Sequence, residues 1–500
     1  MTDRSKSWRV LGLLLLSLFF SLSFSIKGQV VEQELKEPEL VSHLRFLSSD
    51  ELRGRKTGEL SNWVAARYIA EELRKYGIKP GSGPDYFQVI PFGTVIPAER
   101  GILTFGGQTF SIDKDLLVRL APISDMNGEV VFLTHALPDE VTANVKGKLV
   151  LAYLGGEDEG DPLASFGLTV EKKKKLKEMG ALGLVEIYNG RHPWNLIKRY
   201  LGTGRMVVLD QSDDPEFPTL LVNGVSDKVL ENIKSSKSLD FSLETDGTRI
   251  IETPSPNVVG ILEGTDPKLK GEYIALTAHF DHVGTYTSRD RPATQKDSIF
   301  NGARDNAFGV SALLAAAQSL GEVPPKRSIL FIAFTGEEIG LVGSRYYTDH
   351  PTIPLSQIIF NLNTDGAGNS DSTIVSVMGL NRVGAKEEID KGCEEFGLTT
   401  FADPAPEQNL FDRSDNVSFA AKGIPAPTFS PGFKQFDNDI LKHYHQPSDE
   451  AETIDLNYFY KFCQAYAYTA RLIADKSSRP KWSGGDKYES AFLELYGTQK

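Results

Sequence analysis

The sequence predicts an α/β fold in which a mostly parallel central sheet is flanked by helices, with a mixed-β domain inserted into it. Three observations lead to this prediction. From about residue 251 onward, strand-like and helix-like segments alternate, a pattern typical of helices that cover both faces of a parallel sheet. Between about 111 and 250, most segments are short and β-like. The 500 residues also exceed what one compact core usually accommodates.

Residues 29–110 are predicted to form the first part of the main domain. Within it, residues 35–80 read as helices. In the segment 61–81 (SNWVAARYIAEELRKYGIKPG), apolar side chains recur at helical spacing on one face, and Gly77 and Pro80 end the pattern.

The inserted domain is predicted to span residues 111–250. Its β-like runs include GKLVLAYL and PTLLVN, and one helix-like stretch, VEKKKKLKEMGAL, lies among them. We interpret the lysine run Lys172–Lys175 in that stretch as a solvated helix face.

Residues 251–476 are predicted to form the second part of the main domain, and 477–500 a polar C-terminal tail. The predicted strands are 273–278, 328–334 and 358–362. The predicted helices are 309–320, 385–396 and 456–474.

The N-terminus has the layout of a signal peptide over residues 1–28. Arg4, Lys6 and Arg9 form a charged start, an apolar run follows over 10–24, and small residues then precede polar sequence. The alternative is a signal anchor that stays in the membrane, but the run is short for a full span. We therefore expect an exported protein, periplasmic or extracellular, with no stable membrane span after cleavage.

The net charge of −13 argues against a general nucleic-acid binder, because such proteins need a basic surface. The two cysteines, Cys393 and Cys463, could form one disulfide or remain two buried thiols. Residues so far apart in the sequence do not by themselves suggest a cysteine-based metal site or nucleophile.

Side chains of the metal-ligand type follow three consecutive strands of the predicted sheet. They are His279, Glu338 and Asp365, and active sites of open α/β sheets collect at the carboxyl ends of strands. Asp305 in GARDNA and His445 in HYHQPSDE add two more. Each of the five has a structural reading when it is taken singly, such as helix capping for Asp305. Of the other histidines, we interpret five as structural, namely His43, His135, His192, His282 and His350.

Histidine nitrogens and carboxylate oxygens together favour zinc. Five ligands are too many for one tetrahedral ion, and they suit two ions about 3.5–4 Å apart that share a bridging carboxylate. Asp281 is predicted to accept the other ring N–H of His279 and to fix its tautomer. Of the adjacent glutamates Glu337 and Glu338, one would bind metal and the other would hold the bridging water and act as general base.

Six segments of the chain resemble motifs of the zinc aminopeptidase family usually called M28. The resemblance covers roughly 35–110 and 250–475. It rests on AHFDHVG (278–284), NGARDNAFG (301–309), FTGEEIGLVGS (334–344), NTDGAG (363–368), RSDNVSF with GIP (413–425) and YHQPSD (444–449). The fold that it implies is of the zinc-dependent exopeptidase, phosphorylase/hydrolase-like type.

The resemblance implies two Zn2+ ions per chain and an exopeptidase that removes N-terminal residues from peptides. The implied ligands are His279, Asp305 and Asp365 for one ion, and Asp305, Glu338 and His445 for the other. Asp305 would bridge the ions, and Glu337 would be the general base on the water between them. The partner would be a peptide substrate.

The inserted domain resembles the protease-associated (PA) domain that many members of this family carry, which shapes substrate access. The chain departs from the family at Phe411, where some members have an oxyanion-stabilising tyrosine, and at Asn416, where histidine is frequent. Related activities on the same scaffold are carboxypeptidase, dipeptidase and glutaminyl cyclase. A binding protein without catalysis is a further alternative, although no ligand is lost.

Overall fold

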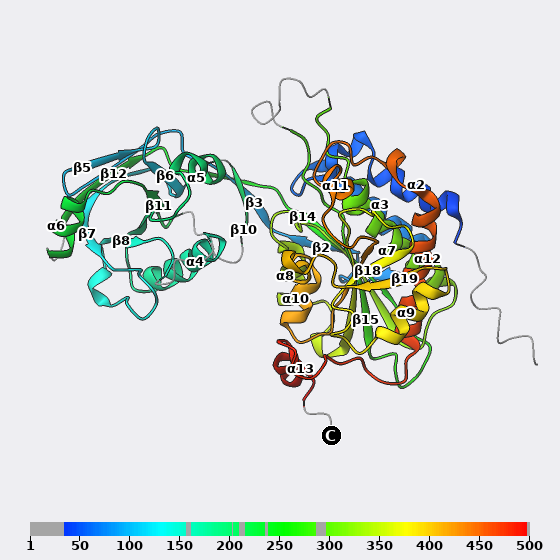
Figure 1. Cartoon of the computed structure of the whole chain (residues 1–500). Coiled ribbons are helices and arrows are strands. Elements are labelled where there is room, and N and C mark those ends of the chain that lie inside the picture. The colour runs from blue at the N-terminus through cyan, green and yellow to red at the C-terminus, as the bar shows by residue number, and fades with distance from the viewer. Residues whose placement is uncertain are drawn as a thin grey trace, which may run out of the picture. The chain divides into compact units, whose positions relative to one another are not determined.

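The computed structural model describes residues 35–156, 162–202, 204–209, 216–235, 239–286 and 297–497. The chain divides into two compact units, which we call unit 1 (1–88 with 256–500) and unit 2 (89–255) (Figure 1). The predicted signal peptide, 1–28, lies outside the described residues. Within the described residues, we find no helix with the length and apolar character needed to cross a membrane.

A mixed sheet forms the centre of unit 1. Its strand order is β1-β14-β16-β15-β17-β20-β18-β19, and β2 also pairs with β14. The strands are β1 (Lys79–Pro80), β2 (Phe87–Ile90), β14 (Ser255–Leu262), β15 (Tyr273–His279), β16 (Ser328–Phe334), β17 (Ile358–Thr364), β18 (Ile374–Met378), β19 (Thr399–Ala402) and β20 (Thr428–Pro431). Strands β16, β15, β17 and β20 are parallel to one another, so the predicted mostly parallel sheet is confirmed at the centre. Antiparallel pairs flank that centre, β14 with β16 and β20 with β18.

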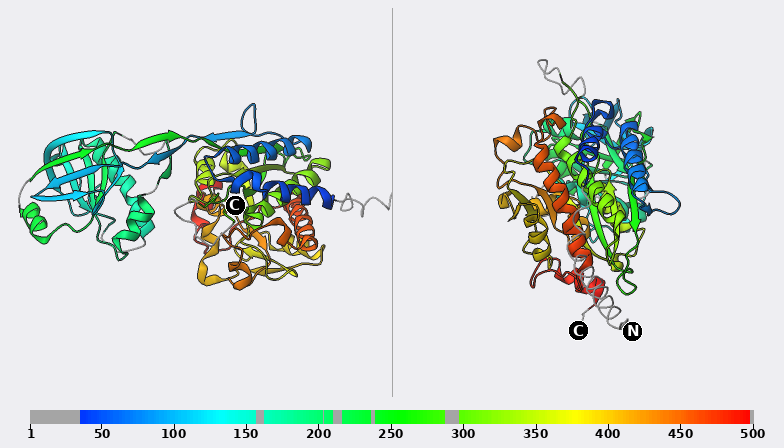
Figure 2. Two further views of the ribbon diagram at one scale, coloured as in Figure 1. Left: turned by 90° about the horizontal axis from the view of Figure 1, so that it is seen from above. Right: turned by 90° about the vertical axis from the view of Figure 1, so that its right-hand side faces the viewer.

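Helices cover both faces of this sheet (Figures 1 and 2). They are α2 (Glu37–Leu47), α3 (Leu60–Lys75), α7 (Phe308–Glu322), α8 (Val342–Asp349), α9 (Lys386–Glu394), α10 (Asn416–Ala421), α11 (Asn438–Leu441), α12 (Leu456–Asp475) and α13 (Glu489–Tyr496). In Figure 1, α7 and α12 lie on one side of the sheet, and α8 and α10 lie on the other. The predicted helices at 309–320, 385–396 and 456–474 are thus confirmed within a few residues.

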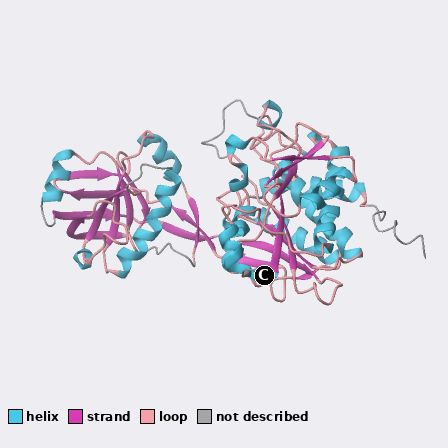
Figure 3. Cartoon of the chain, turned by 60° about the horizontal axis from the view of Figure 1, so that its bottom comes forward, coloured by secondary structure: helices cyan, strands magenta, loops and turns pink. Residues whose placement is uncertain are grey.

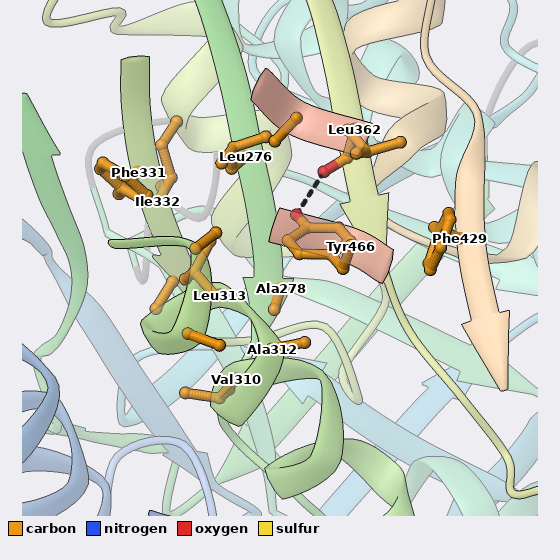
Figure 4. Packing of buried hydrophobic residues seen from close by; sticks show 14 of the residues in the cluster. Leu276, Ala278, Val310, Ala312, Leu313, Phe331, Ile332, Leu362, Phe429 and Tyr466 are labelled. Atoms are coloured by element: carbon orange, nitrogen blue, oxygen red, sulfur yellow. Dashed lines mark hydrogen bonds between the residues drawn. The ribbon is translucent and has the colours of Figure 1, made fainter. Parts of the chain in front are cut away.

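The hydrophobic core of unit 1 lies against its central sheet and includes residues of α7 and α12. Leu276, Ala312 and Ile332 are among its fully buried residues (Figure 4). The hydroxyl of Tyr466 on α12 donates a 2.8 Å hydrogen bond to the carbonyl of Leu362 on β17. This bond satisfies a polar group that burial would otherwise leave unpaired.

The predicted polar C-terminal tail is wrong as a description of residues 477–497. Trp482 is only 5% exposed, and its indole N–H donates to the carbonyl of Gly423 at 3.0 Å. Phe492 on α13 is also 5% exposed. A few aromatic side chains anchor this segment to the core, although its average composition is polar.

Unit 2 is a mixed-β unit with helices around its sheet (Figure 3). Its main sheet has the order β5-β4-β12-β7-β8-β9-β11-β6, and a smaller sheet has the order β10-β3-β13. The strands are β3 (Phe92–Ile96), β4 (Gly101–Phe105), β5 (Gln108–Ser111), β6 (Leu116–Leu120), β7 (Ser124–Phe132), β8 (Leu149–Tyr153), β9 (Gly183–Ile187), β10 (Arg205–Val208), β11 (Thr219–Val222), β12 (Leu239–Thr245) and β13 (Arg249–Glu252). The helices are α4 (Pro162–Glu178), α5 (Trp194–Leu201) and α6 (Asp227–Ser235).

Unit 2 begins at Val89, earlier than the predicted start of the insertion at residue 111. The reason is strand pairing across the unit. Strand β4 pairs along its length with β12, and β3 pairs with both β10 and β13. Partners more than a hundred residues away thus hold 92–105 in unit 2, which local sequence patterns do not reveal.

The interpretation of the lysine run as a solvated face is wrong for its first two members. The side chain of Lys172 is fully buried, and Lys173 is 6% exposed. The Lys172 ammonium donates to Glu186 Oε1 at 3.0 Å and to the carbonyl of Tyr153 at 2.9 Å. The hydroxyl of Thr169 donates to the other oxygen of Glu186 at 2.8 Å. A buried charge is tolerated when it is paired and hydrogen-bonded in this way.

Both cysteines are free and buried, so the reading as two thiols holds and the disulfide does not form. Cys393 lies on α9 and Cys463 on α12. Burial raises the pKa of both thiols. Such thiols behave as small apolar side chains and are chemically inert.

His43 on α2 lies in a buried network with two tyrosines. Its Nδ1 and Nε2 atoms are 2.8 Å and 2.9 Å from the hydroxyls of Tyr68 and Tyr76. The Tyr76 hydroxyl donates to Glu39, so it accepts from Nε2–H, while Nδ1 accepts from Tyr68. Both ring nitrogens are therefore occupied, and the nearby carboxylates of Glu39 and Glu72 do not make this cluster a metal site.

This network predicts a pH dependence of stability. Burial lowers the pKa of His43 from 6.5 to about 4. Between these values the unfolded chain binds the proton and the folded chain does not, so stability falls as pH falls below 6.5. At pH 5 the loss from this one group is about 2 kcal/mol. Denaturant unfolding at pH 7 and pH 5 should show that His43→Gln loses about that much less than the wild type. Equal losses in both proteins would contradict this account.

Candidate metal centre

Three parallel strands deliver polar side chains to one edge of the unit 1 sheet. His279 is the last residue of β15, Glu337 and Glu338 follow β16, and Asp365 follows β17 directly. Within the β15–β16 ladder, His279 is in register with Phe334. Since the carboxyl ends of parallel strands meet at one edge, these side chains converge as the sequence predicts.

Asp305 joins them from η3 (Ala303–Ala307), an irregular turn that precedes α7. The carboxylate of Asp449 holds this turn by accepting the backbone N–H groups of Arg304 at 2.9 Å and of Asp305 at 3.2 Å. The amide of Asn306 donates to the carbonyls of His279 at 3.3 Å and of Thr364 at 3.1 Å. The turn is thus tied to the ends of both β15 and β17.

The five predicted ligands form one cluster in which Asp305 lies at the centre. Its Oδ1 is 3.3 Å from His279 Nε2, and its Oδ2 is 3.1 Å from His445 Nε2. His279 Nε2 is also 3.2 Å from Asp365 Oδ1, and His445 Nε2 is 3.3 Å from Glu338 Oε2. Ligand bonds of 2.0–2.2 Å place the ligand atoms of a tetrahedral zinc about 3.3–3.5 Å apart. The donor types and spacings therefore fit two ions that share Asp305.

The cluster has a strongly negative potential. Burial alone would lower the pKa of His279, yet the carboxylates of Asp365 and Glu337 raise it well above its ordinary value. The same holds for His445. Burial alone would lower its pKa, but the carboxylates of Asp305 and Glu338 raise it to about 9. Carboxylates that draw protons onto neighbouring imidazoles in this way provide the environment that binds a divalent cation.

Glu337 differs from its neighbour Glu338 in having no histidine as an immediate contact. It lines the cleft that contains the cluster, and burial raises the pKa of its carboxyl well above the ordinary value. Its backbone N–H donates to Asp281 Oδ1 at 3.2 Å. Thr57 donates its hydroxyl to Asp281 Oδ2 at 2.8 Å. Asp281 thus fixes the turn that carries Glu337.

The expected contact between the Asp281 carboxylate and His279 is not a hydrogen bond in the structure. The carboxylate Oδ1 is 3.8 Å from His279 Nδ1. The backbone carbonyl of Asp281 is closer, at 3.2 Å. The side chain is occupied by Thr57 and Glu337, so the main chain of the same residue orients the imidazole.

Arg55 lies beneath the cluster with its side chain fully buried. The guanidinium donates to the carbonyls of Phe280 at 2.7 Å, of Asn301 at 2.6 Å and of Gly302 at 3.0 Å. It also donates to the carbonyl of Leu47. These contacts connect the loop after β15 to the loop before η3, and they place one cation near the carboxylates of the cluster.

Besides the cluster, the cleft has an apolar wall and several polar groups. The large apolar side chains are Met378, Leu410, Phe433 and Phe436. The polar groups are Arg413, Ser414, Ser430 and Tyr444. Tyr444 stacks on His445 with ring centroids 4.2 Å apart.

Phe411 and Asn416, the two departures from the family pattern, have structural roles. Phe411 is buried, and the guanidinium carbon of Arg382 lies 3.9 Å from its ring centroid. Asn416 donates to the backbone carbonyls of Phe411 at 3.1 Å and of Ala426 at 3.2 Å.

Sequence reasoning missed two residues of the site. His282, interpreted as structural, lies 2.6 Å from Glu338 through its Nδ1 atom. Tyr444 lies in the YHQPSD motif, directly before His445. The HFDH spacing at 279–282 is a usable signal for His282, but nothing in the local sequence shows that its ring contacts Glu338 or that Tyr444 lines the cleft.

Residues 257–470 match the profile described as peptidase family M28. This part of the chain belongs to peptidase family M28. The chain is 26% identical over 324 residues to aminopeptidase YwaD of Bacillus subtilis (strain 168), a match that covers 63% of this chain and 60% of YwaD. It is 34% identical over 148 residues to the vacuolar membrane protease of Kluyveromyces lactis, which covers 29% of this chain and 14% of that protein. The matches thus span less than two thirds of either curated relative.

Among solved structures, the fold is similar to that of the aminopeptidase from Aneurinibacillus sp. strain AM-1. The TM-score is 0.53 at 19% identity, and the match covers 90% of this chain and 97% of that chain. At this identity the likeness concerns the fold, and it agrees with the α/β class that the sequence predicts.

Proposed function

We propose that the chain is an exported exopeptidase that uses two zinc ions to remove N-terminal residues from peptides. The observation that carries the proposal is the placement of Asp305 between two imidazoles, with one carboxylate oxygen toward His279 and the other toward His445. His279, Asp305 and Asp365 would hold one ion. Asp305, Glu338 and His445 would hold the other. Membership of a peptidase family supports the reaction class.

Zinc bound there would polarise the scissile carbonyl and lower the pKa of water. Glu337 would accept the proton of the attacking water and deliver it to the leaving amine, and its position in the lining of the cleft supports this role. The turn that carries it is fixed by Asp281 and Thr57. The hydroxyl of Tyr444 makes no hydrogen bond to any described residue. It is the candidate donor to the developing oxyanion, in place of the hydroxyl that Phe411 lacks.

Two measurements test this function. Elemental analysis of the purified full chain should give two zinc ions per chain; a single ion would favour the cyclase-type alternative. Aminoacyl-nitroanilides with a free amine should be cleaved, and N-blocked peptides should not. Cleavage restricted to substrates with a free carboxylate end would overturn the aminopeptidase assignment.

One observation favours a second candidate, a dipeptidase or carboxypeptidase. Arg413 is exposed and lines the cleft, and its guanidinium forms no hydrogen bond or ion pair with the residues that the structure describes. A guanidinium beside the metal cluster suits a substrate carboxylate, which it can hold through two parallel hydrogen bonds. In a dipeptide, the free carboxylate lies one residue from the scissile bond.

Arg413→Gln tests this second candidate. If Arg413 binds a terminal carboxylate, wild-type kcat/KM should be higher for Leu-Gly than for Leu-Gly-amide, and the variant should lower that ratio about 10- to 100-fold. Arg413→Lys keeps the positive charge but lacks the two parallel N–H donors of the guanidinium, so it should give an intermediate ratio. A wild-type ratio near one would exclude carboxylate recognition by this residue.

Two further parts of the proposal rest on the sequence. Export is supported by the charged start and apolar run of residues 1–28. The assignment of unit 2 as a PA-like domain is supported by its resemblance in sequence and by its mixed-β architecture.

A further inference from the structure

His282 lies closer to a carboxylate of the proposed metal site than the predicted histidine ligands lie to theirs. Its Nδ1 atom lies 2.6 Å from Glu338 Oε1 and 3.9 Å from Asp305 Oδ2. The histidine–carboxylate distances among the predicted ligands are 3.1–3.3 Å. Two atoms bound to one tetrahedral zinc cannot approach to 2.6 Å, since their separation is about 3.3–3.5 Å. The His282 contact is therefore a hydrogen bond.

The surroundings of the ring identify which nitrogen carries the proton. The side chain is fully buried, and among the described residues its Nε2 atom has no hydrogen-bond partner. A proton on Nε2 would be a buried donor without an acceptor, and it would leave the Nδ1 lone pair facing a carboxylate oxygen. A proton on Nδ1 removes both costs, because it lies in the hydrogen bond to Glu338.

The ring is also held in place from its far side. A Cβ atom at Gly302 would lie 2.6 Å and 2.7 Å from the Cδ2 and Cγ atoms of His282, so only glycine leaves room for the ring. Gly302 has a φ of 60°, a conformation that glycine adopts readily. Arg55 in turn binds the carbonyl of Gly302. The imidazole cannot move away from Glu338 without displacing this loop.

We infer that His282 is a positioning residue whose Nδ1–H holds Glu338 Oε1 and so reserves Glu338 Oε2 for the metal position shared with His445. Glu338 Oε2 is the oxygen that lies 3.3 Å from His445 Nε2. A carboxylate fixed through one oxygen binds an ion through the other alone. The inference rests on the proposed two-ion site and adds a residue that the five-ligand set leaves out. Loss of such an outer hydrogen bond weakens metal binding about 10- to 100-fold.

Three substitutions in the full chain separate this role from mere packing. The amide nitrogen of an asparagine side chain can occupy the place of Nδ1, whereas that of glutamine reaches the place of Nε2. His282→Asn should therefore keep zinc affinity within about threefold of the wild type. His282→Gln and His282→Leu should weaken one of the two ions about 10- to 100-fold and leave the other unchanged. Competition with a chromophoric chelator measures both affinities without any assay of activity.

Equal weakening in the asparagine and leucine variants would overturn the inference. Nitrogen-15 NMR of the zinc-loaded wild type provides a second test, because it reports which ring nitrogen of His282 carries the proton. This test uses no variant, so a folding defect cannot affect it. A protonated Nδ1 with a bare Nε2 supports the assignment, and a protonated Nε2 overturns it. A wild-type protein that binds only one ion would contradict the proposed function itself, whereas the NMR result tests the His282–Glu338 bond in either case.

Discussion

Glu337→Gln is expected to lower kcat by at least about 10²-fold while zinc content stays at the wild-type value. The amide has the shape of the carboxylate but cannot accept the proton of the attacking water. Glu337 has no histidine as an immediate partner, so the substitution leaves the predicted ligand set intact. Steady-state kinetics and elemental analysis on the same preparation measure both quantities.

The neighbouring residue provides a matched control. Glu338→Gln makes the same chemical change one position along the chain, at a carboxylate 3.3 Å from His445 Nε2. It should reduce the zinc content, which Glu337→Gln should not. Near-normal kcat with intact zinc in the Glu337 variant would remove this residue from the role of base.

Asp305→Asn is expected to weaken both ions together and to lower kcat/KM by about 10³-fold or more. Asp305 is the only predicted ligand that belongs to both sets, and metal ions contribute several kcal/mol to this kind of chemistry. The backbone of the turn should persist, because Asp449 holds it through backbone N–H groups.

Asp365→Asn and His445→Ala serve as comparisons, since each removes a ligand of one ion alone. Zinc titrations should show one weakened ion in each of these variants and two in the Asp305 variant. Two ions bound at wild-type affinity by Asp305→Asn would contradict a bridging role. Thermal unfolding in excess chelator should be alike in all three variants if the changes act through metal binding.

The convergence of His279, Glu338 and Asp365 could be predicted from the sequence because it depends on local rules, whereas Asp305 and His445 lie outside the strands and were added from the GARDNA and HYHQPSDE segments. Strand ends are visible in apolar runs such as 273–278, and parallel strands present their carboxyl ends at one edge. His282 and Tyr444 could not be assigned in this way. Their roles depend on distances across loops, such as the 2.6 Å contact to Glu338, and sequence spacing does not determine these.

The misread parts of the fold have a related cause. The start of unit 2 depends on the pairing of β4 with β12, and the burial of Lys172 depends on Glu186 on a later strand. The lysine run and the segment after residue 476 are polar on average, and this average polarity predicted that both would be exposed to solvent. One paired charge accompanies the burial of Lys172 in the first segment, and the indole of Trp482 helps to anchor the second to the core.

The position of Arg55 in the chain also determines the order in which the peptidase unit can assemble during synthesis. Its donor to Gly302 spans 247 residues, about 12–50 s of translation at 5–20 residues per second. The whole of unit 2 is synthesised within that interval. It can fold as a unit before the Arg55 guanidinium binds the carbonyl of Gly302. The metal cluster can therefore form only after the later half of the chain, which carries its ligands, has been made and has returned to a segment that was made first.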